Sequence, residues 1–348
     1  MSALRALVPR ALRRSLGAQV ARVRAARLER DLARIASGND TIVAGPWLGE
    51  VGFELVYWVP FLRWFTERFR VDPGRMLIVS RGGTRSWYRP FASSYRDIFD
   101  HFSPEEYRRK HDERVAANGE QKQRKVLAFE HDLLQELTRD VRSRTMLHPS
   151  TMYELFNPFW WTHTDDSWVL SHARYQKLDA GADVPDLPTS PYTAVKFYFN
   201  DCFPATDENR AFVRRTIEQL AAQGPVVSLT TGLQLDDHGG VDAHALGVRP
   251  FPADVSPRDN LGLQSAIVAR ADAFVGTYGG FSYLAPFLGV RSIAYYGDPN
   301  GFSRRHLLMV RSALHTLESD NLLDVRAVGS DPIFTGARRN WGLTPLPE

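Results

Sequence analysis

The glycine-rich stretch from Asp272 to Asp298 constrains the fold more than any other part of the sequence. Its letters, DAFVGTYGGFSYLAPFLGVRSIAYYGD, predict a strand over Ala273 to Val275, a helix over about Ser282 to Leu288 and a second strand over Ser292 to Tyr296. Gly289 suits the left-handed position that ends such a helix. A strand, a tight turn, a helix and a strand in this order are typical of a parallel α/β sheet.

The turn between the first strand and the helix runs from Gly276 to Ser282 and contains three glycines. Glycine lets the backbone approach a ligand closely, since it has no side chain. The free amides at the start of a helix, with the helix dipole behind them, favour an anion such as a diphosphate. The turn matches neither a P-loop nor a GxGxxG fingerprint, so an ordinary structural turn is the alternative.

The same stretch carries a longer pattern, made by Gly276, Gly280, Ser282, Leu284, Ala285 and the run Leu288-Gly289-Val290. This pattern resembles the donor-site segment of GT-B glycosyltransferases of the lipopolysaccharide heptosyltransferase type, in which a strand ends close to G-x-D-T-G-x-S-H-L-A. Three positions depart from it, because Tyr278, Gly279 and Tyr283 stand where that family has Asp, Thr and His. The resemblance implies two Rossmann-like domains that face each other across a cleft, with a nucleotide-sugar donor on the second.

Composition limits the classes of protein that this chain can belong to. With 348 residues, 43% of them apolar, it is long enough for two domains with cores of their own. The only cysteine, Cys202, excludes an internal disulfide and suits a reducing compartment. No apolar run approaches the roughly 18 residues of a membrane span, and the N-terminus lacks the apolar core of a secretory signal. We therefore expect a cytoplasmic protein.

Residues 1–37 form a basic arm. They hold nine arginines and two acidic residues, Glu29 and Asp31, a net charge of +7, whereas the whole chain has +3. The remainder is therefore slightly acidic, which disfavours nucleic acid as a partner. The Ala, Leu and Arg content predicts helix, with Pro9 interrupting it. Three interpretations remain open: a peripheral anchor on the anionic inner face of the cell membrane, a solvated or partner-packed helical extension, and an organellar targeting peptide.

The first α/β unit begins with a short strand over Thr41 to Trp47, followed by a helix through Arg70. Glu50 and Glu54 are four residues apart, so they lie on one side of that helix near its positive end. In the family that the chain resembles, an Asp six residues before a proline is the general base, and counting back six from Pro60 gives Glu54. The resemblance thus implies a catalytic role for Glu54, with Glu50 as the second candidate. A carboxylate that only complements the helix dipole is the alternative.

Two further segments of the first half carry polar or aromatic residues. The loop Arg81 to Arg85 follows a strand over residues 76–80 and is expected either to contact an acceptor or phosphate or to be a flexible connection. Asn157 to Trp168 concentrates aromatic residues that suit either stacking on a sugar or a buried hinge core. Lys125 to Phe129 is a possible strand.

The second half repeats the alternation of strand and helix. A strand over Thr193 to Phe199 is followed by a helix over Asp207 to Gln223 and a strand over Pro225 to Thr230. The residues Ser256-Pro257-Arg258-Asp259 predict the start of another helix. Alternating strands and helices predict a parallel sheet whose ligand loops follow the carboxyl ends of the strands.

These elements divide the chain into four parts: the arm at residues 1–37, an acceptor domain at 38–184, a donor domain at 185–330 and a tail at 331–348. The predicted donor-binding residues lie at strand ends of the second domain or in the glycine-rich turn: Lys196, Asn200, Thr230, Thr231, Gly276, Thr277, Tyr278, Gly279, Gly280, Phe281, Ser282, Asp298, Arg304 and Arg305. The two arginines are expected to clamp a phosphate. A strand lysine at the rim of a sheet is the alternative for Lys196.

The sequence therefore predicts an α/β enzyme with two Rossmann-like domains, preceded by an arginine-rich helical arm. The resemblance implies a glycosyltransferase of polysaccharide biosynthesis that moves a sugar from a nucleotide sugar to a hydroxyl of a glycan or lipid-linked acceptor. It also implies inversion at the sugar carbon and no metal or cofactor. The alternative from another class is a non-catalytic sugar- or nucleotide-binding protein on the same fold, since a fold does not determine a function.

Overall fold

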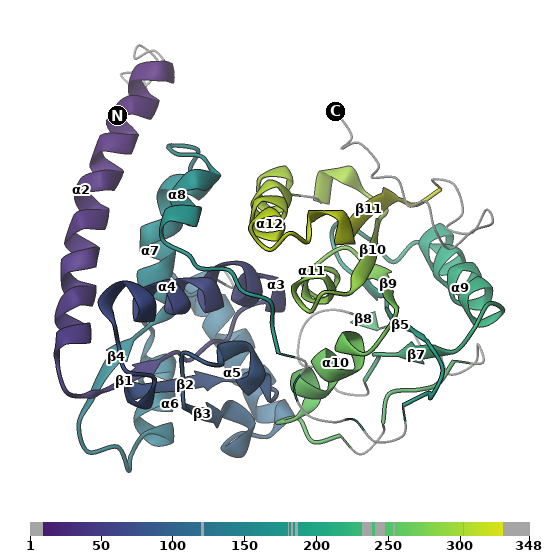
Figure 1. Ribbon diagram of the computed structural model, residues 1–348, viewed down its shortest axis with the longest axis horizontal. Coiled ribbons are helices and arrows are strands. Elements are labelled where there is room, and N and C mark those ends of the chain that lie inside the picture. Colours follow the sequence, from purple (N-terminus) through teal and green to yellow (C-terminus); the bar gives the residue numbers. More distant parts are fainter. Residues whose placement is uncertain are drawn as a thin grey trace.

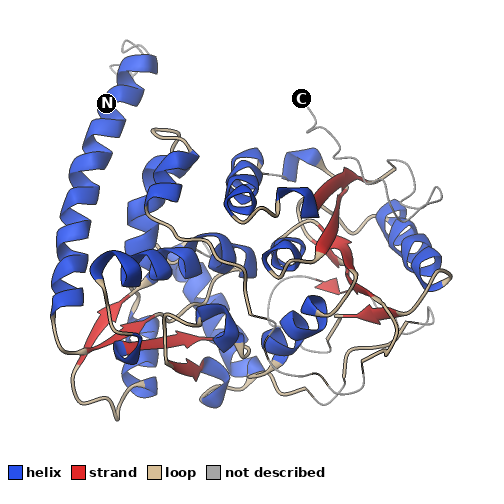
Figure 2. Ribbon diagram, in the orientation of Figure 1, coloured by secondary structure: helices blue, strands red, loops and turns tan. Residues whose placement is uncertain are grey.

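Two parallel sheets with helices packed on them make up the computed structural model of the protein (Figures 1 and 2). It describes residues 10–119, 122–179, 181, 184, 187–231, 239–240, 248–252, 255–301 and 303–329. The strands of the first sheet lie between residues 41 and 147, and those of the second lie between residues 193 and 327. The α/β fold with two Rossmann-like halves is therefore confirmed, and the proposed tail at 331–348 lies outside the described residues.

The first sheet contains β1 (Thr41–Ala44), β2 (Met76–Ser80), β3 (Ser94–Asp97) and β4 (Arg144–Leu147) in the order β3-β2-β1-β4. All of its pairings are parallel. β2 is buried along its whole length, because its apolar residues are covered on both faces. The strand order reverses direction between β1 and β4, and such a switch point opens a crevice at the carboxyl ends of the strands.

The helices of this half follow the predicted periodicity with two exceptions. The predicted first helix is divided into α3 (Val51–Phe53), a π-helical turn (Glu54–Trp58) and α4 (Val59–Phe69), which ends at Arg70 in the left-handed conformation. The possible strand Lys125 to Phe129 is wrong, since α6 begins at Ala128. The remaining helices are α5 (Pro104–Asn118), α6 (Ala128–Leu137), α7 (Pro149–Trp160) and α8 (Asp166–Ser171).

The second sheet contains β5 (Thr193–Lys196), β7 (Val226–Ser228), β9 (Ala273–Thr277), β10 (Arg291–Tyr296) and β11 (Leu323–Ala327). Their order, β11-β10-β9-β5-β7, is that of a doubly wound sheet with its switch point between β5 and β9. A small antiparallel pair, β6 (Tyr198–Phe199) with β8 (Gly239–Gly240), follows β5. The helices are α9 (Asp207–Ala221), α10 (Asn260–Ala269), α11 (Gly280–Phe287) and α12 (Arg304–Thr316).

The arm forms the long helix α2 (Arg10–Ser37), whose inner half packs against α7 and α4. Its contacts come from small and apolar residues spaced by about one helical turn: Ala21, Ala25, Leu28, Leu32, Ile35 and Ala36. The outer end projects beyond the rest of the molecule (Figure 1). The inner half of α2 is therefore packed on the chain's own core, and its removal would uncover core residues of the first half.

The two halves touch directly through glycines. A Cβ on Gly83 would lie 2.7 Å from the carbonyl oxygen of Arg258, and one on Gly262 would lie 2.5 Å from that of Gly83. The amide of Gly262 donates a hydrogen bond to the carbonyl of Gly82 (2.8 Å). The loop Arg81 to Arg85 is thus not a flexible connection, because its two glycines dock on the start of α10. Its contact with an acceptor or phosphate stays a prediction.

Leu32 tests whether α2 belongs to the folded core. Its side chain is 1% exposed, so Leu32→Ala should lower the free energy of unfolding by about 2–5 kcal/mol through lost burial and a residual cavity. Urea denaturation measures this change. Leu16→Ala on the same helix is the control, since Leu16 is 51% exposed and should change stability by less than about 0.5 kcal/mol. Equal effects of the two substitutions would contradict the packing of α2.

Candidate functional site

The switch point of the second sheet brings Lys196 and the glycine-rich turn together. Lys196 ends β5 and pairs with Gly276 in β9. The Lys196 Nζ lies 3.9 Å from the ring centre of Phe281, the second residue of α11, and donates to Gln264 Oε1 (2.5 Å). A cation therefore lies beside the start of a helix whose first amides have no carbonyl one turn earlier to bond. Together these groups suit an anion.

The three glycines of the turn are required by contacts within the protein. A Cβ on Gly276 would lie 2.1 Å from the Lys196 carbonyl oxygen, and one on Gly279 would lie 2.1 Å from the Tyr198 hydroxyl. A Cβ on Gly280 would lie 2.7 Å from the amide nitrogen of Gly52. A side chain at Gly280 would thus separate the two halves, and its effect on a ligand could not be isolated.

Thr277, Tyr278 and Ser282 hold the turn in shape. The Thr277 hydroxyl donates to the Tyr198 carbonyl (2.7 Å) and accepts from the Tyr198 amide (3.0 Å). Ser282 Oγ donates to the carbonyl of Gly279 (2.8 Å) and accepts from its amide (3.1 Å). Tyr278 is buried edge-on against Tyr283. These side chains support the backbone of the turn.

The loop after β5 and the loop after β10 close on themselves. The Asn200 side chain accepts from the Phe203 amide (2.9 Å), and Asp298 accepts from the Asn300 amide (2.8 Å). The Thr230 amide donates to Ser228 Oγ (3.1 Å), and Thr231 is the last described residue before 232–238. In this arrangement the described side chains of Asn200 and Asp298 stabilise turns at the edge of the sheet.

The two arginines of the predicted clamp, Arg304 and Arg305, have different surroundings. Arg305 lies with its guanidinium 4.4 Å from the ring centre of Phe159 in α7 and donates to the Thr164 carbonyl, so it joins α12 to the first half. Arg304 is exposed at the start of α12. Arg305 is therefore engaged in a contact between the halves, and the phosphate clamp stays a prediction.

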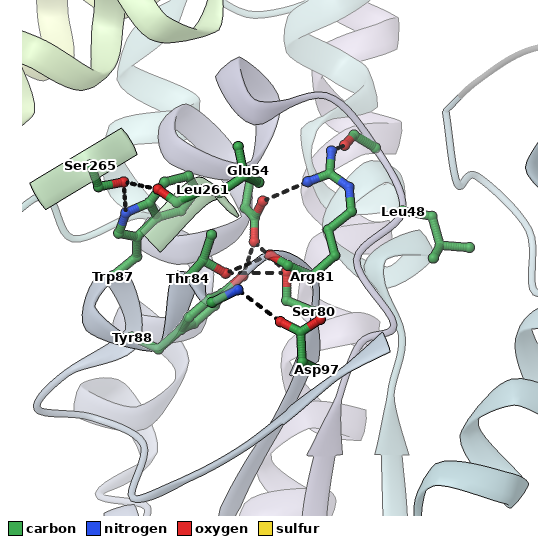
Figure 3. A network of polar contacts seen from close by, with 12 residues as sticks. Leu48, Glu54, Ser80, Arg81, Thr84, Trp87, Tyr88, Asp97, Leu261 and Ser265 are labelled. Carbon is green, nitrogen blue, oxygen red and sulfur yellow. Dashed lines mark hydrogen bonds and ion pairs between the residues drawn. The ribbon is translucent and has the colours of Figure 1, made fainter. Parts of the chain in front are cut away.

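Glu54 lies in a buried polar cluster at the switch point of the first sheet (Figure 3). Its Oε1 accepts hydrogen bonds from Ser80 Oγ (2.7 Å) and from the Tyr88 hydroxyl. Its Oε2 lies 3.9 Å from Arg81 Nη1 and accepts no hydrogen bond from the described residues. One carboxylate oxygen is thus held in place while the other has acceptor capacity to spare.

Burial controls the charge state of Glu54. The side chain is 0% exposed, and this loss of hydration raises the pKa of Glu54 to about 7, with Arg81, Tyr88 and Ser80 opposing the rise. Desolvation is the largest of these effects, so burial sets the pKa of Glu54 although the residue lies near the start of a helix. A carboxylate with a pKa near neutrality is suited to accept a proton.

Backbone geometry separates Glu54 from Glu50. Glu54 opens the π-helical turn, a deviation frequently found at functional sites. Glu50 precedes α3, in an extended conformation, and its side chain is exposed. Between them, Gly52 contacts Gly280 at the start of α11. Glu54 therefore lies two residues from the contact with the glycine-rich turn.

His306 of α12 makes a further contact between the halves that the sequence did not suggest. Its ring stacks on Phe53 with the ring centres 5.1 Å apart, and its Nδ1 lies 3.0 Å from the Tyr57 hydroxyl. Burial lowers the pKa of His306 to about 4, so the ring is neutral near pH 7. Ser80, Arg81 and Tyr88 were also missed as partners of Glu54, although Ser80 ends the strand next to β1 and could have been inferred from a parallel sheet.

The described residues contain no cluster of three or more His, Cys, Asp or Glu side chains placed to hold a metal ion. In the same part of the chain, no helix combines the length and apolar character that crossing a membrane requires.

Neither a protein-family model nor a curated protein matches the chain. Solved heptosyltransferases are among the structures similar to it. ADP-heptose lipopolysaccharide heptosyltransferase II of E. coli has a TM-score of 0.41 and 13% identity, over 85% of this chain and 91% of that one. E. coli heptosyltransferase WaaC with ADP has a TM-score of 0.40 and 14% identity, over 80% and 99%. A putative UDP-N-acetylglucosamine 2-epimerase from Listeria monocytogenes has a TM-score of 0.33 and 12% identity, over 81% and 90%.

The raised pKa of Glu54 predicts a stability that depends on pH. Its folded pKa of about 7 exceeds the usual 4.5, so this stabilisation is fully present below about pH 4.5 and is lost as the pH rises through 7. Glu54→Gln resembles the protonated form and does not titrate. Between about pH 5 and about pH 8.5, its free energy of unfolding should therefore gain about 2–3 kcal/mol relative to the native protein. Urea denaturation at both values measures this, and a constant difference would mean that Glu54 is ionised throughout.

Proposed function

We propose that the protein is a glycosyltransferase that moves a sugar from a nucleotide sugar to a hydroxyl group. The observation that carries this proposal is the contact of Gly52 with Gly280, which brings the Glu54 segment to the start of α11. A proton acceptor in one Rossmann-like half thereby lies next to an anion-favouring helix start in the other. Transfer from a nucleoside diphosphate to a hydroxyl needs these two functions on opposite sides of the reacting carbon.

The donor would bind at the β5/β9 switch point. Lys196 Nζ and the first amides of α11 provide positive charge and hydrogen-bond donors for a diphosphate. The same groups would stabilise the negative charge that the diphosphate gains when the bond between it and the sugar breaks. Gln264 holds Lys196 at this position through a hydrogen bond.

Glu54 would act as the general base. It takes the proton of the acceptor hydroxyl while the hydroxyl oxygen bonds to the sugar carbon, and the nucleoside diphosphate leaves with the electron pair of the broken bond. Attack from the face opposite the diphosphate inverts the configuration at that carbon. Because Glu54 is fully buried, the hydroxyl reaches it only when the groups that cover the carboxylate move aside.

A non-catalytic sugar- or nucleotide-binding protein is the second candidate. It is favoured by the complete burial of Glu54 and by the protein groups that fill the space around Gly279 and Gly280. The two candidate functions differ in whether the protein hydrolyses the donor in water. A transferase splits its donor slowly without an acceptor, whereas a binding protein leaves the donor intact.

We further propose that the acceptor is a glycan or lipid-linked molecule of polysaccharide biosynthesis. The protein would work in the cytoplasm on the inner face of the cell membrane, with residues 1–37 toward the lipid. The net charge of +7 in these residues supports attraction to anionic lipid. We expect the reaction to need no cofactor.

Glu54→Gln tests the assignment of the base. Its turnover should fall by about 10²–10⁴-fold, because a general base commonly contributes this factor, while donor affinity stays unchanged. Single-turnover kinetics and calorimetry measure the two effects. Glu50→Gln is the control and should keep its rate, since Glu50 is exposed. A loss confined to Glu50→Gln would reverse the assignment, and no loss in either variant would move the base elsewhere.

Lys196→Gln tests the donor site. Removal of a charged hydrogen-bond donor should weaken binding of a nucleoside diphosphate by about 10- to 100-fold, as measured by calorimetry. Lys177→Gln is the matched control, because Lys177 is an exposed lysine outside this site. Unchanged affinity in a folded Lys196→Gln protein would remove Lys196 from the donor site.

A further inference from the structure

An open groove runs between α2 and α7, on the side of the first half that carries the arm. Its apolar part has a volume of about 320 Å³ and is formed mainly by side chains of these two helices and by Trp161. The apolar walls are Leu16, Val20, Ala21, Ala25, Leu155, Pro158 and Trp161. This volume lies in the range of small-molecule sites.

A more polar cavity of about 590 Å³ continues the groove toward the C-terminal half of α2. The two cavities share Arg24, Glu154 and Asn157, so they adjoin each other and give the groove an apolar end and a polar end. Arg27 and Arg124 also line the polar end. Arg124 Nη1 donates to Asn157 Oδ1 (2.8 Å), which directs its guanidinium to the wall formed by α7.

The apolar end presents large side chains to solvent. Leu16 is 51% exposed, Val20 52% and Trp161 52%. Gly17 brings α2 against the chain just beyond α7, because a Cβ there would lie 2.8 Å from Cγ of His163. The walls are therefore held in place by packing beside the groove, while their apolar surface stays uncovered by any described residue.

We propose that this groove binds one anionic lipid of the membrane. Its acyl chain would lie along Leu16, Val20 and Trp161, and its phosphate would lie between Arg24 and Arg124. Tryptophan at the edge of such a site suits the boundary between lipid chains and headgroups. The inference rests on the membrane location in the proposed function and does not depend on the transfer reaction.

The charge of the polar end determines which lipid headgroup the groove favours. Three arginines line the polar end, Arg24, Arg27 and Arg124, against two carboxylates, Asp31 and Glu154. Asp31 is already paired with Arg34, at 3.1 Å. The excess of positive charge complements a headgroup with net negative charge and gives no such advantage to a zwitterionic one.

The periodicity of α2 offers a matched pair of substitutions. Val20 lines the groove, whereas Val23, three residues along and 72% exposed, does not. Val20→Glu and Val23→Glu make the same change in charge and size on one helix. They separate a lipid held in the groove from a helix that merely lies on the membrane.

The experiment uses the full chain and vesicles of phosphatidylcholine with or without phosphatidylglycerol, read by co-sedimentation. The native protein should prefer the anionic vesicles, and this preference should weaken with added salt. Val20→Glu should bind them at least about tenfold more weakly, because a carboxylate would enter an apolar wall. Val23→Glu should bind within about twofold of the native protein, as is usual for a surface substitution. Arg24→Gln should reduce the preference for phosphatidylglycerol.

Each other outcome overturns the proposal. Equal losses in Val20→Glu and Val23→Glu would mean that a face of α2 lies on the membrane without a lipid in the groove. No vesicle binding by the native protein, or equal binding to both vesicle types, would reject an anionic lipid. A native dimer that Val20→Glu converts to monomer would assign the surface to a second copy of the chain.

Two further measurements keep the result interpretable. Trp161→Ala repeats the test if Val20→Glu fails to fold, which circular dichroism detects, and it should also weaken vesicle binding. Donor hydrolysis without lipid reports on the transfer reaction separately. If Val20→Glu loses lipid binding but still hydrolyses the donor, the groove is supported as a site separate from the transfer reaction. If the native protein binds lipid but does not hydrolyse the donor, the transferase proposal is rejected and the lipid proposal stands.

Discussion

The approach of two glycines, Gly52 and Gly280, is the contact on which the arrangement of the two halves depends. Each residue lies at the beginning of a helix that follows the central strand of its sheet, β1 or β9. Without side chains, the two helix starts meet at backbone distance. The positive ends of two helix dipoles are thereby brought together, and this arrangement is more favourable with negative charge nearby. Glu54 supplies such a charge when it is ionised, and a bound diphosphate would supply more.

Burial gives the Glu54 carboxyl a pKa that its position in the sequence would not predict. The same carboxyl in water would be ionised at neutral pH and would be a weak base. Inside the first half, desolvation makes its two protonation states nearly equal in free energy near pH 7. Ser80 and Tyr88 hold Oε1 of Glu54 by hydrogen bonds. The orientation of Oε2 is thereby fixed before any acceptor binds. The side chains around Glu54 come from β2 and the turn after it, whereas Glu54 lies on the helix after β1. The register in which β1 pairs with β2 therefore decides whether these side chains meet.

Local patterns predicted most of the fold, because each strand and helix of a doubly wound sheet has its own apolar periodicity. The strand over residues 76–80, the helix that starts at Asp207 and the left-handed Gly289 were all confirmed. The errors have physical causes. Lys125 to Phe129 contains the start of α6, where the Leu127 amide donates to Glu130 Oε2. α10 begins at Asn260 because Ser256 to Asp259 form a turn against the first half. Contacts between the halves could not be read from spacing, so the packing of Gly82 and Gly83 on α10 and of Arg305 on Phe159 was not predicted.

The π-helical turn at Glu54–Trp58 accommodates one residue more than an α-helix would over the same length. Each α-helical residue advances the direction of the side chains by about 100°. The extra residue therefore acts as a rotational offset between α3 and α4, which lets α4 bury its apolar face while the start of the segment faces α11. One extra residue in a helix rotates the side chains before it about the helix axis and does not change the strand pairing of the sheet. The orientation of Glu54 is thus set by the number of residues between it and α4, independently of its own chemistry.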